Sequence, residues 1–135
     1  MGVVEGQNEQ LARDAWEALA RWDYDTWLAG VDENVVYIPT KEWFDATPRR
    51  GREALRDFME GYRKDWSKWD ARIHEIRGNG DRVLLETRIR ATGAKSGIEL
   101  RGRTFHVMTF AGGLITQMQD FIVEDEALAA AGLAT

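Results

Sequence analysis

One strand-like segment near the end of the chain carries an acidic residue on its apolar face. Side chains alternate between two faces along 114–123, so Met118 and Asp120 point the same way. Gln117 and Gln119 lie on the other face, which we expect to meet water or a partner. Asp120 is therefore predicted to point into an interior, where a carboxylate is costly unless it is paired or used. In a dry pocket it can act as a general base on water or on a carbon next to a carbonyl.

A histidine lies 14 residues before this acid, on the preceding predicted strand. A turn at Gly112-Gly113 would bring the two strands side by side as a hairpin. The face that carries His106 and Met108 is mostly apolar, so we expect both side chains to point inward. His106 could hydrogen-bond a substrate oxygen or hold Asp120 in place. The alternative is a core histidine that a neighbour satisfies.

The composition fits one soluble globular domain over residues 1–135, with 44% hydrophobic and 30% charged residues. No apolar run approaches the roughly 20 residues of a membrane-spanning helix. The N-terminus lacks the basic start and apolar core of a signal peptide, so we expect a cytoplasmic protein without a membrane partner. The net charge of −5 argues against nucleic-acid binding.

The chain has no cysteine, which excludes disulfides, thiol catalysis and cysteine metal ligands together. Its two histidines, His74 and His106, share no helix-like ligand spacing, so we expect no structural zinc site. Any catalysis is therefore expected to rest on acid and base side chains, without a cofactor. The six tryptophans are many for this length; most are explained by packing, and some could line a cavity.

The elements that must position these residues change in character near residue 68. Before it, apolar residues recur with helical spacing. Three helices are predicted: one over 7–22, a short one capped by Asp23 or Asp25, and one that begins after Gly51 and runs through residue 66. A short strand over 34–39 ends in a proline, which indicates a sheet edge or strand end.

After residue 68 the sequence alternates in the manner of strands joined by turns, and Asn79-Gly80 is a strong hairpin signal. Four strands are predicted, over 69–77, 82–91, 98–110 and 114–123. A closing helical turn is expected over 125–131. Helices followed by an antiparallel meander give an α+β order. A curved sheet with helices on one face leaves a pocket between the layers, where a small hydrophobic ligand can bind.

Several motifs are spread over nearly the whole chain. They are Gly51-Arg52-Glu53-Ala54-Leu55, Phe105-His106-Val107-Met108-Thr109-Phe110, Gly113-Leu114-Ile115, Glu126-Ala127-Leu128 and Ala131-Gly132-Leu133. Together they resemble the SnoaL-like branch of the nuclear transport factor 2-like superfamily. The resemblance implies a single SnoaL-like domain with a cystatin-like α+β cone, in which three N-terminal helices pack on a curved, mainly antiparallel sheet that encloses a pocket. The superfamily hosts many chemistries on this one fold.

The resemblance also implies roles for individual residues. Asp120 falls where SnoaL cyclases carry their acid/base aspartate, and His106 where they carry a pocket histidine. Tyr37 falls where limonene epoxide hydrolase has a water-positioning tyrosine. Together with Tyr37, the side chains of Trp43 and Tyr62 could form an aromatic wall for the ligand, or they could simply belong to the core.

Arg88 matches by position the arginine of that hydrolase's acid–arginine–acid triad, but Arg90 replaces the second acid, which argues against epoxide opening. If Arg88 points inward, it would favour an anionic or enolate-forming ligand. Met108 and Met118, on the inward faces of their strands, are also expected to contact the ligand. Alternation favours the other placement. Glu86, Arg88 and Arg90 share one face, and their charges would send that face to solvent or to a dimer interface.

Two classes of function follow. The first is a cofactor-free acid/base enzyme of the cyclase or isomerase type, acting on a small hydrophobic carbonyl compound. In it Asp120 would be the base, and His106 or Tyr37 a hydrogen-bond donor. The second is a non-catalytic module that binds an apolar ligand or assists another protein.

The outer face of the sheet is predicted to be apolar at its centre. Its β-branched and aromatic residues are Phe105, Val107, Phe121 and Val123. An apolar face of that size tends to be covered, so we expect a homodimer through the outer sheet face.

Overall fold

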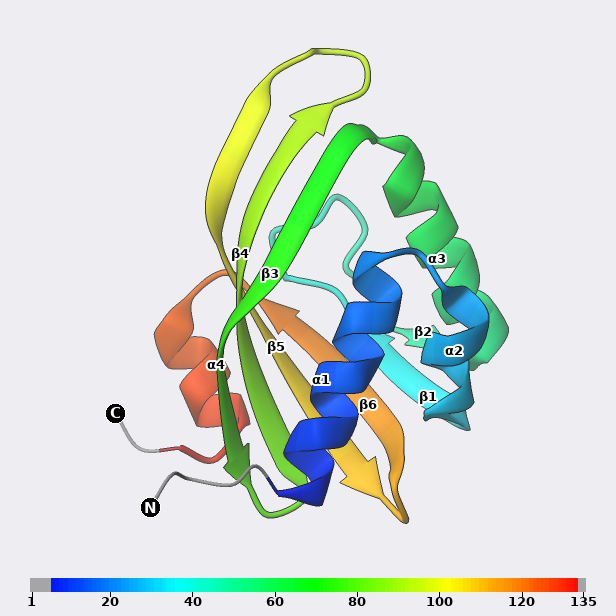
Figure 1. The fold of residues 1–135 in the computed structure, drawn as a ribbon, viewed down its shortest axis with the longest axis vertical. Helices are drawn as coiled ribbons and strands as arrows, with labels where there is room; N and C mark the ends of the chain where they lie inside the picture. Colours follow the sequence, from blue (N-terminus) through cyan, green and yellow to red (C-terminus); the bar gives the residue numbers. More distant parts are fainter. Residues whose placement is uncertain (1–5, 134–135) are drawn as a thin grey trace.

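Three helices lie against one face of a curved sheet (Figure 1). The computed structural model describes residues 6–133. The helices are α1 (Gln7–Ala20), α2 (Tyr24–Ala29) and α3 (Arg52–Lys64). Asp23 caps α2, as one of the two predicted alternatives had it, because its side chain accepts a hydrogen bond from the backbone N–H of Thr26 at 3.2 Å. Within the described range, no helix is both long and apolar enough to cross a membrane.

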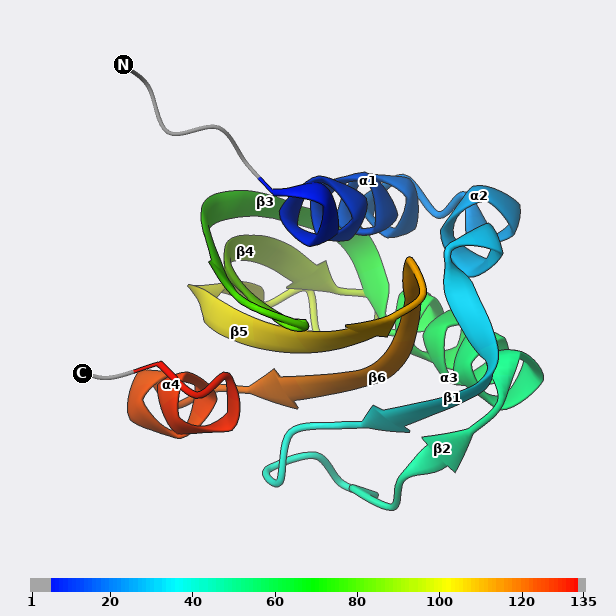
Figure 2. The ribbon, with the colours of Figure 1, turned by 90° about the horizontal axis from the view of Figure 1, so that it is seen from below.

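The other segments form one six-stranded sheet in the order β2-β1-β6-β5-β4-β3. The strands are β1 (Val31–Ile38), β2 (Arg49–Arg50), β3 (Trp66–Asn79), β4 (Arg82–Gly93), β5 (Glu99–Ala111) and β6 (Leu114–Phe121). Neighbours pair antiparallel except β1 and β6, which pair in parallel. The long strands bend around the helix layer (Figure 2). The predicted α+β fold, with its antiparallel meander, is confirmed; the short strand β2 was not predicted.

The core fills the space between the helices and the sheet. From the helices it takes Trp16, Leu19, Trp27, Leu55 and Met59, and from the sheet it takes Val83, Leu85, Met108, Ile115 and Met118. All of these side chains are less than a tenth exposed. This packing holds the concave face of the sheet at a fixed distance from the helices, which allows a cavity to persist beside the core.

A β-bulge changes which residues of β6 face the core. Thr116 is left unpaired between Ile115 and Gln117, which pair with consecutive residues of β5. Ile115 is therefore buried in the same core as Met118, although strict alternation places the two on opposite faces. Beyond the bulge the predicted alternation holds, so that Asp120 faces the helix layer together with Met118.

The outer face of the sheet is covered by the chain itself, since α4 (Glu124–Ala130) packs there (Figure 2). The cluster beneath and around this helix comprises Leu84, Phe105, Val107, Ala127, Leu128 and Ala131. Phe105 and Val107 are only 2% and 4% exposed, and Phe121 packs against the same cluster, whereas Val123 is 44% exposed. This corrects the expectation that the face is open for a second copy to cover. The homodimer itself stays a prediction.

Candidate functional site

A cavity of about 410 Å³ lies between the helix layer and the sheet. Most of its wall is apolar, and its largest apolar side chains are Trp16, Trp27, Trp43, Phe58, Trp66 and Trp69. A volume of this size is typical of small-molecule sites. The few polar groups on the wall therefore decide what chemistry the cavity can support.

Asp120 lies on this wall and accepts two hydrogen bonds from the protein. The hydroxyl of Tyr37 donates to Oδ2, and Nδ1 of His106 lies 2.6 Å from Oδ1. The three residues come from three adjacent strands, β1, β6 and β5. The side chains of His106 and Asp120 are 8% and 17% exposed, so the group is largely shielded from water while Asp120 still borders the cavity.

Both cavity tyrosines that face this region are protonated at neutral pH. Burial raises the pKa of Tyr37 well above its ordinary value, and the charge of Asp120 raises it further. Burial also raises the pKa of Tyr62, which lines the same cavity. Each phenol is therefore a neutral hydrogen-bond donor, and Tyr37 already donates to Asp120.

Two threonines contact the other nitrogen of His106. Oγ1 of Thr87 and Oγ1 of Thr104 lie 3.1 and 3.2 Å from Nε2, and the two oxygens are 2.6 Å apart. If Nδ1–H donates to Asp120, Nε2 accepts from one hydroxyl while the second hydroxyl donates to the first, which satisfies every polar atom of the group. The ring of Trp16 lies against the imidazole, with 4.4 Å between ring centroids. His106 is therefore held in one orientation toward Asp120.

The threonine pair and the contact between Trp16 and His106 were not predicted from the sequence. A signal for the threonines was present, because Thr104 shares the inward face of His106 and lies directly opposite Thr87 on β4. Nothing in the spacing of the first helix distinguished Trp16 from an ordinary core residue.

Of the predicted site residues, six line the cavity: Tyr37, Trp43, Tyr62, His106, Met118 and Asp120. Met108 does not. It is fully buried and pairs with Met118 across the β5–β6 ladder, inside the core rather than on the cavity wall. This corrects the expectation that Met108 contacts a ligand.

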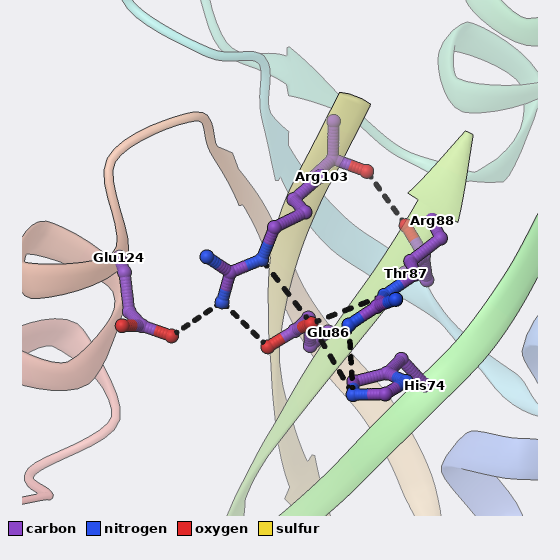
Figure 3. A network of polar contacts seen from close by, with 7 residues as sticks. His74, Glu86, Thr87, Arg88, Arg103 and Glu124 are labelled. Atoms are coloured by element: carbon purple, nitrogen blue, oxygen red, sulfur yellow. Dashed lines mark hydrogen bonds and ion pairs between the residues drawn. The ribbon is translucent and has the colours of Figure 1, made fainter. Parts of the chain in front are cut away.

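Arg88 lies on the opposite face of the sheet (Figure 3). Its side chain is 60% exposed, hydrogen-bonds Nε2 of His74 at 3.1 Å and lies 3.9 Å from the Glu86 carboxylate. Of the two placements left open for Arg88, the structure has the outward one, so the role in ligand binding that depended on the inward placement is wrong. The alternation along β4 was the better guide, because Thr87 is buried and Ile89 lines the cavity.

The outer-face carboxylate of Glu86 belongs to a separate polar network (Figure 3). Arg103 donates to it at 2.9 and 3.3 Å and also donates to Glu124 of α4 at 2.9 Å. The Arg103 guanidinium lowers the pKa of Glu86 below its ordinary value. This network ties α4 to β4 and β5 and lies away from the cavity wall.

The chain resembles known proteins over most of its length. The family model described as a SnoaL-like domain matches residues 12–118. No curated protein matches the chain significantly.

Many solved structures share the fold. A nuclear transport factor 2-like protein of unknown function from Burkholderia pseudomallei is 18% identical, with a TM-score of 0.80 over 94% of this chain and 98% of that one. A proposed SnoaL-like polyketide cyclase from a Jannaschia species is 17% identical, with a TM-score of 0.75 over 99% of each chain. A hypothetical protein with a ketosteroid isomerase-like fold from Catenulispora acidiphila, solved with trimethylamine, is 15% identical, with a TM-score of 0.74 over 93% of this chain and 94% of that one.

At these identities the structural likenesses speak for the fold alone. The family match, however, spans most of the chain. The arrangement of helices over a curved, open sheet agrees with the fold of the similar solved structures. The chain thus belongs to the SnoaL-like domain family.

Proposed function

We propose that the protein is a cofactor-free acid/base enzyme of the cyclase or isomerase type, acting on a small hydrophobic carbonyl compound. The observation that carries the proposal is the carboxylate of Asp120 on the wall of a largely apolar cavity, held there by Tyr37 and His106. A general base must lie within hydrogen-bond reach of the proton that it removes. The cavity allows a ligand carbon to reach Asp120.

In this proposal Asp120 removes a proton from the carbon next to the carbonyl and returns it to another atom of the same molecule. In an isomerase the acceptor is a second carbon; in a cyclase the carbanion attacks a second carbonyl carbon, its C=O π bond opens, and the resulting alkoxide takes the proton back from Asp120. A carboxylate has about four lone-pair sites, so the bonds from Tyr37 and His106 leave room for a third contact. The two donors fix the orientation of the carboxylate. The apolar wall excludes water that would otherwise compete for it.

The comparisons support this class of reaction at the level of the neighbours' names. One neighbour is a proposed polyketide cyclase, and another has a ketosteroid isomerase-like fold.

The second candidate is a non-catalytic module that binds an apolar ligand or assists another protein. One observation favours it: each oxygen of Asp120 already accepts a hydrogen bond from the chain. Tyr37, Asp120 and His106 could therefore serve only to join three strands beside the cavity.

Exchange of ligand protons with deuterium distinguishes the enzyme from the binding module, even though the natural substrate is not identified. The probe is 2-acetylnaphthalene, whose methyl group lies next to its carbonyl, incubated with the protein in deuterium oxide and followed by proton NMR. We expect the wild type to accelerate exchange and Asp120→Asn to reduce that acceleration by about 10²-fold or more. The replacement is nearly isosteric, so ligand affinity should change little.

Asp70→Asn is the matched control, because Asp70 pairs with Arg72 away from the cavity. It should exchange protons as the wild type does. If aryl ketones bind but none exchanges faster than in buffer, or if Asp120→Asn keeps the full rate, the enzyme proposal fails at this residue and the binding module is favoured.

A further inference from the structure

Tyr62 presents to the cavity a hydroxyl group whose oxygen is already engaged. Nε1 of Trp69 donates a hydrogen bond to this oxygen at 3.0 Å. The direction of the bond is fixed, because an indole nitrogen can only donate. The Tyr62 proton must therefore go to another acceptor, and residues 6–133 supply none within hydrogen-bond distance.

A second tryptophan packs beside Tyr62. The centroids of the Trp66 and Tyr62 rings are 5.8 Å apart. The Trp66 nitrogen is buried and makes no hydrogen bond with the described part of the chain. Both residues line the cavity, but the Trp66 nitrogen is buried, so the Tyr62 hydroxyl is the donor of the two that is left for a ligand.

The two cavity tyrosines therefore differ. Tyr37 uses its hydroxyl proton in a hydrogen bond to Asp120, whereas the hydroxyl proton of Tyr62 is available for a hydrogen bond to a ligand. Tyr62 also senses the charge of Asp120, which contributes to raising its pKa. The base on β6 and the free donor on α3 thus border one cavity and act on each other electrostatically.

We infer that Tyr62 donates a hydrogen bond to the carbonyl oxygen of the substrate, and that the cavity selects neutral hydrophobic ketones. This inference deepens the proposed function and rests on it. When Asp120 removes a proton from the neighbouring carbon, negative charge develops on that oxygen, and a donor aimed at it stabilises the transition state more than the ground state. The bond from Trp69 polarises the Tyr62 hydroxyl and makes it a stronger donor.

An anionic ligand fits the cavity poorly. The carboxylate of Asp120 lies on its wall, and Arg88 faces away from it on the outer side of the sheet. Arg101 does line the cavity, but its side chain is 68% exposed and pairs with Glu99 at 2.8 Å, so its charge is already matched. A neutral ketone needs only what is present: one acceptor for Tyr62, an acidic C–H for Asp120, and apolar surface for the tryptophans.

Infrared spectroscopy of a bound ketone tests the donor directly. The probe is 2-acetylnaphthalene labelled with carbon-13 at the carbonyl. In the wild-type complex its carbonyl stretch should move to lower frequency than in cyclohexane. In Tyr62→Phe it should return close to the cyclohexane value. The same change should weaken ketone binding by about 2- to 12-fold, the equivalent of one hydrogen bond.

The matched ligand is 2-isopropenylnaphthalene, in which a methylene group replaces the carbonyl oxygen. Its affinity, read from quenching of tryptophan fluorescence, should be the same for Tyr62→Phe and the wild type. The matched variant is Tyr24→Phe, because the Tyr24 hydroxyl is buried without a partner among the described residues and lies off the cavity wall. It should leave the frequency and both affinities unchanged.

A frequency that is unshifted in the wild-type complex, or equally shifted in Tyr62→Phe, would overturn the inference, and so would failure of the ketone to bind. If Tyr62→Phe does not fold, Trp69→Phe serves instead and should give a shift between those of the wild type and cyclohexane. The result is independent of turnover. A Tyr62-dependent shift without Asp120-dependent exchange would uphold the donor and overturn the base.

Discussion

His106 and Asp120 lie directly opposite each other on β5 and β6, with Nδ1 of the histidine 2.6 Å from Oδ1 of the aspartate. Because side chains alternate along a strand, a one-residue slip of this register would turn one of the two away from the other. The backbone hydrogen bonds between β5 and β6 therefore set the positions of both side chains.

Two substitutions of His106 should distinguish the effect of its hydrogen bond to Asp120 from the effect of its side-chain volume. His106→Leu keeps an apolar volume but leaves Oδ1 of Asp120 without its donor. We expect it to lower the free energy of unfolding by about 1–3 kcal/mol and to slow proton exchange of the probe ketone. His106→Asn places an amide N–H near the position of Nδ1 and should retain more of both. Urea unfolding and deuterium exchange measure the two effects. Equal loss in both variants would show that Asp120 does not depend on this donor.

The hydroxyls of Thr87 and Thr104 should be able to replace each other as the hydrogen-bond partner of Nε2 of His106. Either Thr87→Val or Thr104→Val leaves one hydroxyl for Nε2 of His106, so each should cost about 0.5–1.5 kcal/mol of stability. The double variant leaves Nε2 without a partner and should lose more than the sum, by about 0.5 kcal/mol or more. Nitrogen-15 NMR of the imidazole should show a changed Nε2 signal chiefly in the double variant. Strict additivity with an unmoved signal would mean that the threonines do not set the state of His106.

Alternation along the strands predicted that Asp120 and His106 share an inward face, because both lie in regular stretches of the ladder. Alternation gave the wrong face for Ile115, because β6 has an extra, unpaired residue at Thr116. A β-bulge of this kind cannot be recognised from a single sequence. For Arg88, the match by position to another enzyme competed with alternation, and the structure follows alternation.

Other features depend on contacts between distant segments. A helical turn was predicted at the C-terminal end, but no local pattern says which sheet face α4 covers, so Phe105 and Val107 were expected to be open. The bond from Trp69 to Tyr62 depends on the angle between α3 and β3. Tyr62 could therefore be assigned to an aromatic wall, but not to the role of a hydrogen-bond donor.

Gly102 should set how far a ligand can extend toward the cavity mouth. It lines the cavity, and a Cβ built on it would meet no other atom within 4 Å. Gly102→Val should therefore fold normally, with a melting temperature equal to or above that of the wild type, since valine favours strands. It should weaken binding of 2-acetylnaphthalene by about 10-fold, or about 1.4 kcal/mol. Gly61→Ala, in open space on α3, is the control and should bind normally. Unchanged affinity in Gly102→Val would place the ligand elsewhere.

The Glu86–Arg103 pair should make stability depend on acid pH. Arg103 lowers the pKa of Glu86 in the folded chain below the ordinary value of 4.5. Its contribution is therefore fully present above about pH 4.5 and is lost as the pH falls through the lower, folded-state pKa. Glu86→Gln should cost about 1 kcal/mol at pH 7, a modest figure because Arg103 is half exposed and the pair is screened by solvent.

Urea unfolding of the wild type and Glu86→Gln, from neutral pH down to about pH 3, measures this contribution. The difference between the two proteins should shrink as the pH falls, and moderate salt should reduce it at pH 7 because the pair is only partly shielded. Glu99→Gln is the control. Its carboxylate is 43% exposed and pairs with Arg90 and Arg101, so the loss should stay below about 0.5 kcal/mol. A Glu86→Gln difference that stays constant with pH would assign the loss to packing beneath α4 rather than to the ionised pair.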